Sequence, residues 1–242
     1  METIIQKYIR LLKQYDIGLD VEIVDDPTLP VQEIQEDGGN FLLSLNQAKL
    51  LPDLGPEPYL ASSARKILLP RLVLETERLV LRRFRKEDAL CCFEFLSDQQ
   101  SCYDDGGYEP YSAMDQSYSQ LMEEFASDEG RYMIALKDTN EAIGTIHIWE
   151  DSSRAVEAME IGYCINPSRR RNGYAFEAVS ALIHLLQEEL QLELLLGGAF
   201  ADNAASISLL RKLGFIQEGI LRKAIWHVEK GPTDLVRFYR DR

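Results

Sequence analysis

Histidine and cysteine are scarce in this chain of 242 residues. The three histidines lie far apart, and the four cysteines comprise one adjacent pair and two isolated residues. Zinc sites need such ligands at short, paired spacings, which this sequence does not contain. The sequence therefore predicts no bound metal and reduced thiols with structural roles. The residues concerned are His147, His184, His227, Cys91, Cys92, Cys102 and Cys164.

Long apolar runs are also missing. No stretch reaches the roughly 18 apolar residues that a membrane-spanning helix requires. The N-terminal segment METIIQKYIRLLKQYD carries scattered charges and no separate apolar core, so it predicts an amphipathic helix and not a signal peptide. We therefore expect a cytoplasmic protein without a membrane partner.

Basic residues are few relative to acidic ones. Lysine and arginine number 26 against 40 aspartates and glutamates, which gives a formal net charge of -14. Binding to nucleic acid needs a basic face, so a general nucleic-acid surface is not expected. The charge favours cationic acceptors weakly, and colloidal solubility is the better explanation.

The composition is that of a folded chain, and the length favours one well-cored domain plus a smaller one. Residues 1–70 predict a small α+β accessory module, with a helix near residues 2–14 and a strand-like segment at 19–25. A turn-rich stretch at 27–39 and a short apolar segment at 41–45 follow, and any further helix begins after Pro58. No catalytic constellation is visible in this module.

From Arg71 onward the predicted elements are longer and more regular, which defines a second domain at residues 71–242. Residues 72–84 predict one strand with a central irregularity, and a Gly-containing loop at 102–111 separates two helices. Three strands then follow in succession, and two helix–strand alternations close the chain. The predicted helices are 86–97, 112–126, 173–189 and 204–213, and the further strands are 131–138, 142–151, 155–166, 192–200, 215–228 and 233–241, the last two separated by Gly231-Pro232.

The turn from Asn166 to Ala175 joins the third of these strands to a helix with apolar residues at helical spacing. Asn172 is suited to cap that helix, and Gly173 lets its first turn approach a ligand closely. Free amides at a helix start bind anions, and three arginines precede them. An ordinary capped helix after a solvated basic loop is an equally good interpretation. A Walker A loop and a dinucleotide Gly-x-Gly-x-x-Gly are both absent.

The order Arg170-x-x-Gly173-x-Ala175 resembles the coenzyme A pyrophosphate signature of the Gcn5-related N-acetyltransferases (GNAT). Further matching segments lie in the expected order on the expected elements, and the opening LETERLVLRRF is similar to the first strand of the RimJ/RimL-type branch. The resemblance covers residues 71–242 and leaves residues 1–70 unrecognised. The matching segments are Glu160-Ile-Gly-Tyr163, Gly173-Tyr-Ala-Phe-Glu-Ala178, Asn203-Ala-Ala-Ser206 and Leu213-Gly-Phe215.

This resemblance implies an α+β (mixed α/β) GNAT fold, with a mostly antiparallel sheet that splays between the strands ending at Ile165 and Phe200. Acetyl-coenzyme A would lie between those strands as cosubstrate, with its pyrophosphate on the amides that follow Arg170. The backbone near Cys164 would orient the acetyl carbonyl. The implied coenzyme-binding residues are Cys164, Ile165, Arg170, Arg171, Asn172, Gly173, Tyr174, Ala175 and Asn203.

Transfer of an acetyl group to an amine needs a proton acceptor for the amine and a donor for the departing thiolate. Glu160 is the candidate base, because it shares a strand face with Cys164 and matches the branch's glutamate; a salt-bridge role is the alternative. Many relatives place a tyrosine acid where this chain has Leu210, and the RimJ/RimL-type branch carries instead the hydroxyl found here at Ser206, which is therefore the candidate acid. A helix-capping role is its alternative.

A covalent acetyl-enzyme through Cys164 is a minor alternative, because strand cysteines are usually small core residues. The loop that follows Cys102 lies where relatives build the acceptor pocket, so Asp104, Asp105 and Tyr108 are candidates for holding a cationic amine. A solvated loop is the alternative there.

The predicted function is an N-acetyltransferase that moves acetyl from acetyl-coenzyme A to a primary amine, on a protein N-terminus or a small molecule, by direct attack. Two other classes stay open: a catalytically drifted acyl-coenzyme A sensor, and a module whose first 70 residues dock a partner protein. The sequence does not identify the acceptor, and it leaves a homodimer open.

Overall fold

The computed structural model describes residues 10, 11, 14, 20–24, 35–37, 40–44, 62, 65, 66 and 68–242. Ahead of residue 62 it contains a three-stranded sheet in the order β1-β3-β2, in which β1 and β3 are parallel and β2 and β3 antiparallel. The strands are β1 (Asp20–Val24), β2 (Gln35–Asp37) and β3 (Asn40–Ser44). The strand expected at 19–25 is confirmed as β1, and the short apolar segment at 41–45 coincides largely with β3, whereas β2 lies in the segment predicted as turn. Most of the helix expected at 2–14 lies outside the described residues, of which 10, 11 and 14 are helical.

The main sheet has eight strands in the order β10-β11-β9-β8-β7-β6-β5-β4. All neighbours are antiparallel except β8 and β9, which run parallel. This mixed sheet with flanking helices confirms the α+β fold class. The strands are β4 (Leu74–Glu75), β5 (Leu79–Arg82), β6 (Arg131–Leu136), β7 (Ala142–Glu150), β8 (Ala158–Ile165), β9 (Leu194–Phe200), β10 (Ile216–His227) and β11 (Gly231–Asp241).

Two strand predictions need correction. The single irregular strand at 72–84 is instead a tight antiparallel pair, β4 and β5, because the Thr76 amide donates to the Leu79 carbonyl at 2.8 Å and closes a turn. Gly231 and Pro232 do not separate the last two strands but begin β11, where they pair with His227 and Trp226.

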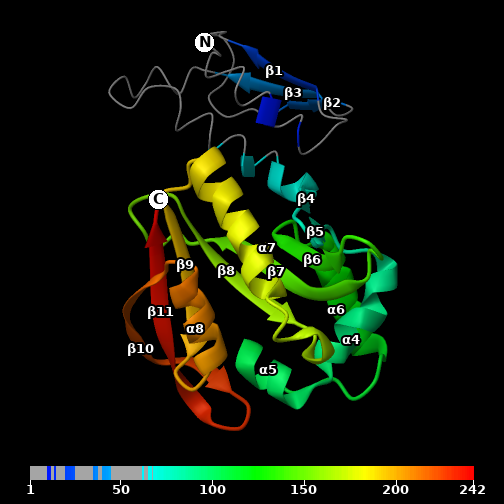
Figure 1. Cartoon of the computed structure of the whole chain (residues 1–242), viewed down its shortest axis with the longest axis vertical. Helices are drawn as coiled ribbons and strands as arrows, with labels where there is room; N and C mark the ends of the chain where they lie inside the picture. Colours follow the sequence, from blue (N-terminus) through cyan, green and yellow to red (C-terminus); the bar gives the residue numbers. More distant parts are fainter. Residues whose placement is uncertain are drawn as a thin grey trace.

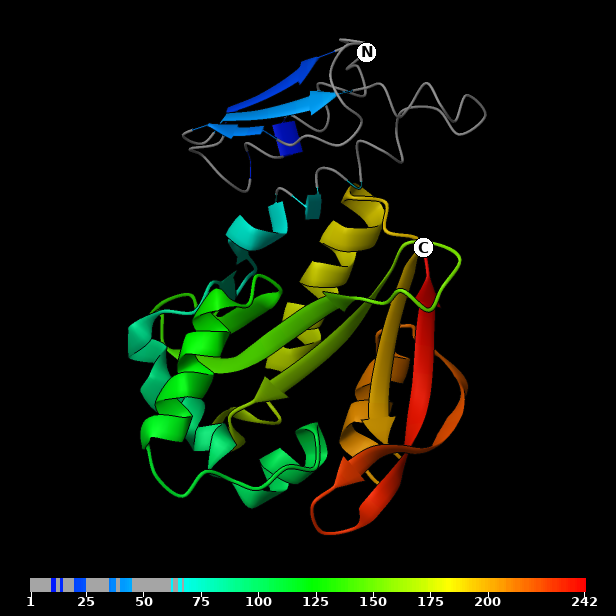
Figure 2. The ribbon, with the colours of Figure 1, turned by 180° about the vertical axis from the view of Figure 1, so that it is seen from behind.

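Helices cover both faces of the sheet (Figures 1 and 2). The cluster on one face brings α7 and α8 against the strands, and the cluster on the other brings α4 and α6 against them. The helices are η1 (Leu69–Arg71), η2 (Lys86–Asp88), α4 (Ala89–Leu96), α5 (Gln99–Asp105), α6 (Gln116–Ser127), η3 (Pro167–Arg169), α7 (Tyr174–Ile183), the π-helical η4 (His184–Glu189) and α8 (Ala204–Lys212). None of the described helices is long and apolar enough to cross a membrane.

Helix α5 is the main error of the predicted element order, because residues from Cys102 onward were expected to form a loop. The Asp98 side chain caps this helix by accepting hydrogen bonds from the Ser101 amide at 2.8 Å and the Ser101 hydroxyl at 2.5 Å. The helix then ends at Asp105, before the pair Gly106 and Gly107. The loop prediction holds only beyond that point.

Residues ahead of Arg71 contribute to the core of the main sheet. Leu11, Leu68 and Leu69 are buried in the same cluster as Leu72. The Arg65 guanidinium is also buried and donates to the Leu190 carbonyl and the Glu157 carboxylate. A division of the chain at residue 70 stays a prediction, and these contacts show that residues on both sides of it share one core.

Candidate active site

Strands β8 and β9 separate near their carboxyl ends. Their parallel pairing covers only three positions and stops where Glu160 pairs with Leu196, although β8 continues to Ile165 and β9 to Phe200. We call this divergence the fork; Figure 2 shows the two strands parting toward α5. The fork opens at the carboxyl ends of both strands, and a helix follows each of them, α7 after β8 and α8 after β9.

Alternation along β8 decides which backbone groups face the fork. The Ala158 carbonyl accepts from Asp151, and the Asn166 amide donates to Ile143, so even-numbered residues of β8 bond toward the β7 side. Odd-numbered residues therefore point their amides and carbonyls toward β9. The Cys164 backbone is consequently used within the sheet, and the Ile165 carbonyl accepts from Arg170 Nε at 3.0 Å. Beyond the last pair, the Ile161 carbonyl, Tyr163 and the Ile165 amide present the open edge.

The start of α7 presents unpaired amides beside the fork. Glu177 N donates to the Gly173 carbonyl at 3.0 Å, and the amides from Arg171 to Phe176 have no acceptor within the described part of the chain. Gly173 is the N-cap with φ of 81°, a left-handed conformation that favours glycine. The prediction that Asn172 caps the helix is wrong, because its side chain donates backward to the Arg169 and Arg170 carbonyls at 3.0 Å.

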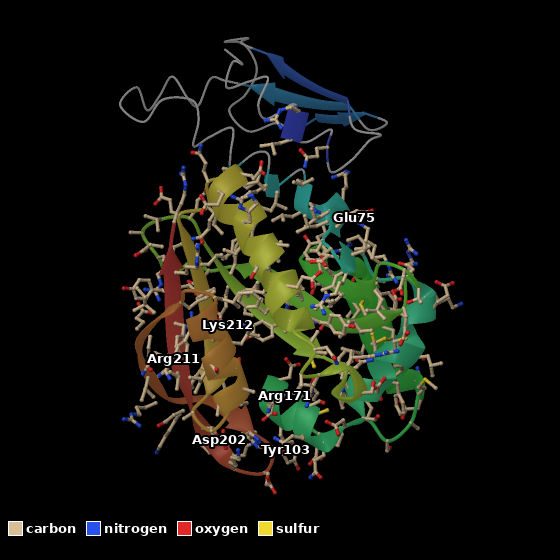
Figure 3. All side chains as sticks on the ribbon, viewed as in Figure 1. Glu75, Tyr103, Arg171, Asp202, Arg211 and Lys212 are labelled. Atoms are coloured by element: carbon tan, nitrogen blue, oxygen red, sulfur yellow. The ribbon has the colours of Figure 1, made fainter. Side chains whose placement is uncertain are left out.

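The three arginines before α7 have different roles. Arg169 forms an ion pair with Glu141 at 2.7 Å, and Arg170 donates to the Ser101 hydroxyl at 2.6 Å. Arg171 is exposed, and its guanidinium has no partner in the described ranges, which leaves it available to an anion. Figure 3 labels Arg171 at the end of α7 that faces α5.

Contacts from the β4–β5 turn hold the first turn of α7 in place. The Glu177 carboxylate accepts from the Thr76 hydroxyl at 2.6 Å, the Arg78 amide at 2.8 Å and Arg78 Nε at 2.7 Å. Desolvation opposes these bonds, but together they lower the pKa of Glu177. Arg78 also donates to the Asn172 carbonyl at 3.1 Å and lies over the Tyr174 ring. The amides at this helix start are therefore fixed before any ligand binds.

Helix α5 connects the two arms of the fork. From the β8 side, Arg170 reaches Ser101 of α5. From the β9 side, Asn203 Nδ2 donates to the Asp104 carbonyl at 3.3 Å, while its Oδ1 caps α8 by accepting from the Ser206 amide at 3.0 Å. The side chains of two residues predicted to bind coenzyme are thus engaged with α5 or the α8 cap.

A hydroxyl pair spans the fork on its helical side. The Tyr163 phenol of β8 lies 3.1 Å from the Ser206 hydroxyl, which sits in the first turn of α8. Leu210, one turn further along α8, is buried against the sheet and offers no polar group. The sequence interpretation considered Ser206 without a partner and missed Tyr163.

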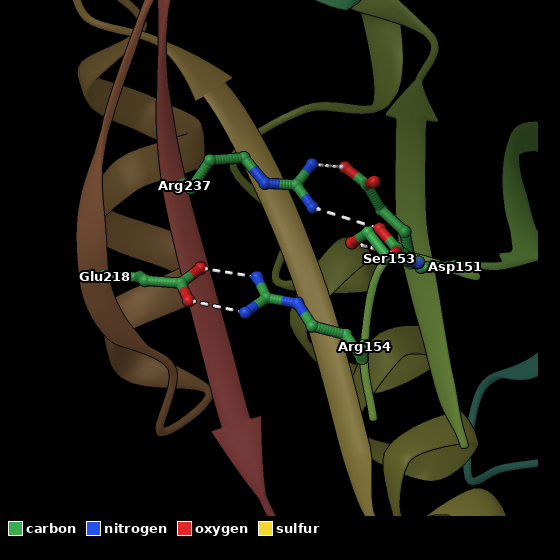
Figure 4. Close-up of polar contacts among 6 residues, drawn as sticks. Asp151, Ser153, Arg154, Glu218 and Arg237 are labelled. Atoms are coloured by element: carbon green, nitrogen blue, oxygen red, sulfur yellow. Dashed lines mark hydrogen bonds and ion pairs between the residues drawn. The ribbon is translucent and has the colours of Figure 1, made fainter. Parts of the chain in front are cut away.

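Glu160 belongs to an ion network at the closed end of the fork. Figure 4 shows its neighbours Asp151, Arg154, Glu218 and Arg237. Glu160 Oε1 accepts from Arg237 Nη1 at 2.6 Å, and Arg237 Nη2 lies 3.5 Å from Asp151. The Glu160 side chain is 13% exposed, and no group in the described part of the chain donates to its Oε2. The neighbouring Arg154–Glu218 pair has two bonds of 2.7 Å. Glu160 therefore has one engaged and one free carboxylate oxygen.

Asp105 and Tyr108 meet at the end of α5, where the Tyr108 hydroxyl donates to the Asp105 carboxylate at 3.0 Å. Asp105 is exposed as a residue, but desolvation of its carboxyl group raises its pKa despite the hydrogen bond from Tyr108. Burial raises the pKa of Cys164, and the nearby charge of Asp105 raises it further. Cys164 is therefore held as a thiol, which disfavours the covalent alternative.

His147 lies across from Gly162 on the face that carries Glu160, and the sequence interpretation did not consider it as a base. Its Nε2 lies 2.9 Å from Asp128, and Arg131 Nη2 lies 3.2 Å from its Nδ1. Desolvation and the Arg131 charge lower the pKa of His147. Both ring nitrogens are occupied, so His147 is not available as a base.

Comparison with known proteins agrees with this geometry. A family model described as "Acetyltransferase (GNAT) domain" matches residues 78–216. The uncharacterized N-acetyltransferase YoaA of Bacillus subtilis is 36% identical over 160 residues, which cover 64% of this chain and 88% of that protein. The [ribosomal protein uS5]-alanine N-acetyltransferase of Escherichia coli is 26% identical over 166 residues, covering 62% and 81%.

Among solved structures, a GNAT-family acetyltransferase from Bacillus anthracis superposes with a TM-score of 0.61 at 22% identity. The superposition covers 70% of this chain and 98% of that one, which shows a shared fold. The family model spans more than half of the present chain. The chain therefore belongs to the GNAT family of N-acetyltransferases, which use acetyl-coenzyme A as cosubstrate.

Proposed function

We propose that this protein binds acetyl-coenzyme A in the fork and transfers the acetyl group to a primary amine, on a protein N-terminus or a small molecule, by direct attack. The observation that supports this most strongly is the end of β8–β9 pairing at Glu160 and Leu196, at the same end of the sheet as the unpaired amides of α7. Strand edges and a helix start together suit a long ligand with an anionic part.

The residues fit the two halves of that ligand. The amides from Arg171 to Ala175 and the free Arg171 guanidinium would hold the pyrophosphate, supported by the positive end of the α7 dipole. The open edge of β8 at Tyr163 would pair with the amide groups of the pantetheine arm. Arg170 and Asn203 would act indirectly, because their side chains fix α5 and α8.

Acetyl transfer requires the amine to lose a proton as it attacks the thioester. We assign this proton to Glu160 Oε2, since Oε1 is bound to Arg237, which keeps the carboxylate oriented. Ser206 would donate a hydrogen bond to the sulfur as it gains the electron pair of the broken bond. These two side chains come from opposite arms of the fork.

The acceptor amine would approach past the end of α5. Asp105 and Tyr108 form a polar pair there, and the Asp104 carbonyl is already used by Asn203. An ammonium group would be held by the Asp105 carboxylate before it is deprotonated, and the net charge of -14 favours cationic acceptors. Peptide N-termini merit testing, because one relative is named for acetylating an alanine of a ribosomal protein.

Coenzyme release with a panel of amines and N-terminal peptides tests the proposal. We expect tight acetyl-coenzyme A binding by calorimetry and turnover with at least one acceptor class. Silence across a broad panel despite tight binding would contradict the assigned chemistry and return the protein to the role of an acyl-coenzyme A sensor. Failure to bind the coenzyme would contradict the fork as its site.

The segment before Arg71 is assigned a supporting role. We infer that residues 1–70 form an accessory module of a cytoplasmic enzyme, on the grounds of their separate small sheet and the absence of a catalytic constellation in their sequence. Substitutions within the small sheet of this module should leave activity on free amines unchanged while changing recognition of a protein acceptor.

A further inference from the structure

One turn after Ser206, helix α8 places Leu210 against the sheet, and this side chain carries no polar group. Leu210 is 1% exposed, and its Cδ2 lies 3.0 Å from where a Cβ on Gly197 would stand. No hydroxyl from that position can serve the departing sulfur. Within the described residues, the polar groups that span the fork on this side are those of Ser206 and Tyr163.

Either hydroxyl can donate in the Tyr163–Ser206 hydrogen bond. The Tyr163 hydroxyl lies 3.1 Å from Ser206 Oγ and 3.5 Å from the Ser206 carbonyl oxygen, which can only accept. With the phenol proton on Ser206 Oγ, Tyr163 leaves the serine proton free, whereas with it on the carbonyl Ser206 Oγ donates to Tyr163. Burial raises the pKa of Tyr163 to about 12, against the smaller opposite effect of the Ser206 bond, so the phenol keeps its proton at neutral pH.

The Ser206 hydroxyl has a proton to donate when its oxygen accepts from Tyr163. In that arrangement the described part of the chain offers the serine proton no acceptor other than the phenol oxygen. The backbone of Tyr163 faces the open edge of β8, so the side chains that meet here border the path assigned to the pantetheine arm. When a hydroxyl oxygen accepts a hydrogen bond from a phenol, its own O–H points away from that phenol.

We propose that Tyr163 is a positioning residue that fixes the Ser206 hydroxyl as the hydrogen-bond donor to the leaving sulfur. This inference rests on the proposed function. The amine nitrogen forms the new bond to the acetyl carbon and gives a proton to Glu160, and the C–S bond breaks with its electron pair going to sulfur. Ser206 stabilises that sulfur, which takes up a proton from solvent, and Tyr163 keeps its own throughout.

Three variants test the inference: Tyr163→Phe, Ser206→Ala and the double variant, each assayed by coenzyme release with the best acceptor. Tyr163→Phe should lower kcat about 10-fold with little change in KM for acetyl-coenzyme A, the size expected for one hydrogen bond that acts in the transition state. Since Tyr163 acts through Ser206, the double variant should be no slower than Ser206→Ala alone.

Tyr239→Phe is the matched control. Tyr239 on β11 is also half-buried, and the described part of the chain shows no hydrogen bond to its hydroxyl, so this variant should keep wild-type kcat. Losses that multiply in the double variant, or full activity of Ser206→Ala, would overturn the inference. An inactive wild type would instead contradict the proposed function, so the two failures are distinguishable.

Discussion

At the scale of single residues, Glu160 combines two properties that a base in this site needs. The ion pair to Arg237 fixes its orientation, and its second oxygen is free of protein donors in the described ranges. We expect Glu160→Gln to lower kcat by about 10²- to 10⁴-fold, the usual loss when a general base is removed. Coenzyme affinity by calorimetry should be unchanged, because the amide keeps the Arg237 contact.

Glu150→Gln provides the comparison, since Glu150 ends the adjacent strand and is exposed. It should behave as wild type in both assays. A Glu160→Gln enzyme with normal kcat would show that another group accepts the proton, and Asp105 would then be the first carboxylate to test.

The charge of Asp105 lowers the stability of the fold at neutral pH, although the proposed function uses that charge. The pKa of Asp105 in the folded protein lies above its ordinary value of 3.8. At pH values between the ordinary and the raised pKa, the folded state therefore binds more protons than the unfolded chain. Stability therefore falls as pH rises through that window. Asp105→Asn removes this loss, so its Tm should exceed that of wild type at neutral pH and approach it below pH of about 4.

The same variant should reduce kcat/KM for a cationic amine while sparing coenzyme binding. Asp115→Asn should instead lower the Tm at neutral pH. Hydrogen bonds from Ser117 and the Tyr118 amide lower the pKa of Asp115, and this stabilises the folded protein at neutral pH. Thermal unfolding at several pH values checks both. An Asp105→Asn protein that melts below wild type at neutral pH would refute the assignment.

At the scale of elements, the sequence predicted what local pattern controls. Alternation located β6 to β8, and the helix after Gly173 followed from apolar spacing. Helix α5 was missed, because its acids and following glycines are typical of loops and its position depends on distant residues, Arg170 and Asn203. Tertiary contacts override local propensity in such cases.

The candidate site was also predicted only in part from the sequence. Motif order indicated Glu160, Ser206 and the α7 amides, whereas the partners that give them direction lie far away in sequence. Tyr163 is 43 residues from Ser206, and Arg237 is 77 residues from Glu160. No local spacing rule connects such pairs, because only the strand order brings β11 and β8 within reach of one another. The Asn172 cap failed for a local reason, since a left-handed glycine took the capping position.

The start of α7 is the element on which coenzyme binding depends. Gly173→Ala places a side chain in the left-handed region, at a cost of about 1–2 kcal/mol, although the new Cβ would meet only Arg78 Nη2 at an ordinary 3.6 Å. Relief of that strain would turn the first amides of the helix, so we expect coenzyme affinity to fall about 10-fold.

Gly219→Ala on β10 is the control, because a Cβ there would meet nothing within 4 Å and the backbone is not left-handed. It should bind coenzyme as wild type does. Calorimetric titration measures both. Unchanged affinity in Gly173→Ala would show that these amides do not hold the pyrophosphate.

At the scale of the whole molecule, the fork weakens the sheet at its centre, and other contacts compensate. Three backbone positions join β8 to β9, and ion pairs from Arg237 and Arg154 connect the C-terminal hairpin to the strands beyond the fork. Helix α5 adds a second connection at the open end. The two halves can therefore part around a ligand without separating.

The N-terminal residues also contribute to the core of the main sheet. Leu11 is fully buried in the cluster that contains Leu68, Leu72 and the strands of the main sheet, although it precedes them by more than 50 residues. If that packing stabilises the transferase domain, Leu11→Ala should cost about 2–5 kcal/mol of unfolding free energy, as large-to-small core changes do.

Leu90→Ala is the matched substitution at an exposed site, since Leu90 is 68% exposed on α4, and it should change the unfolding free energy by less than about 0.5 kcal/mol. Urea unfolding followed by circular dichroism compares the two at equal protein concentration. Equal stability of Leu11→Ala and Leu90→Ala would mean that the N-terminal segment folds independently of the core. A single cooperative transition at lower urea for Leu11→Ala would mean that the accessory module and the acetyltransferase domain unfold as one unit.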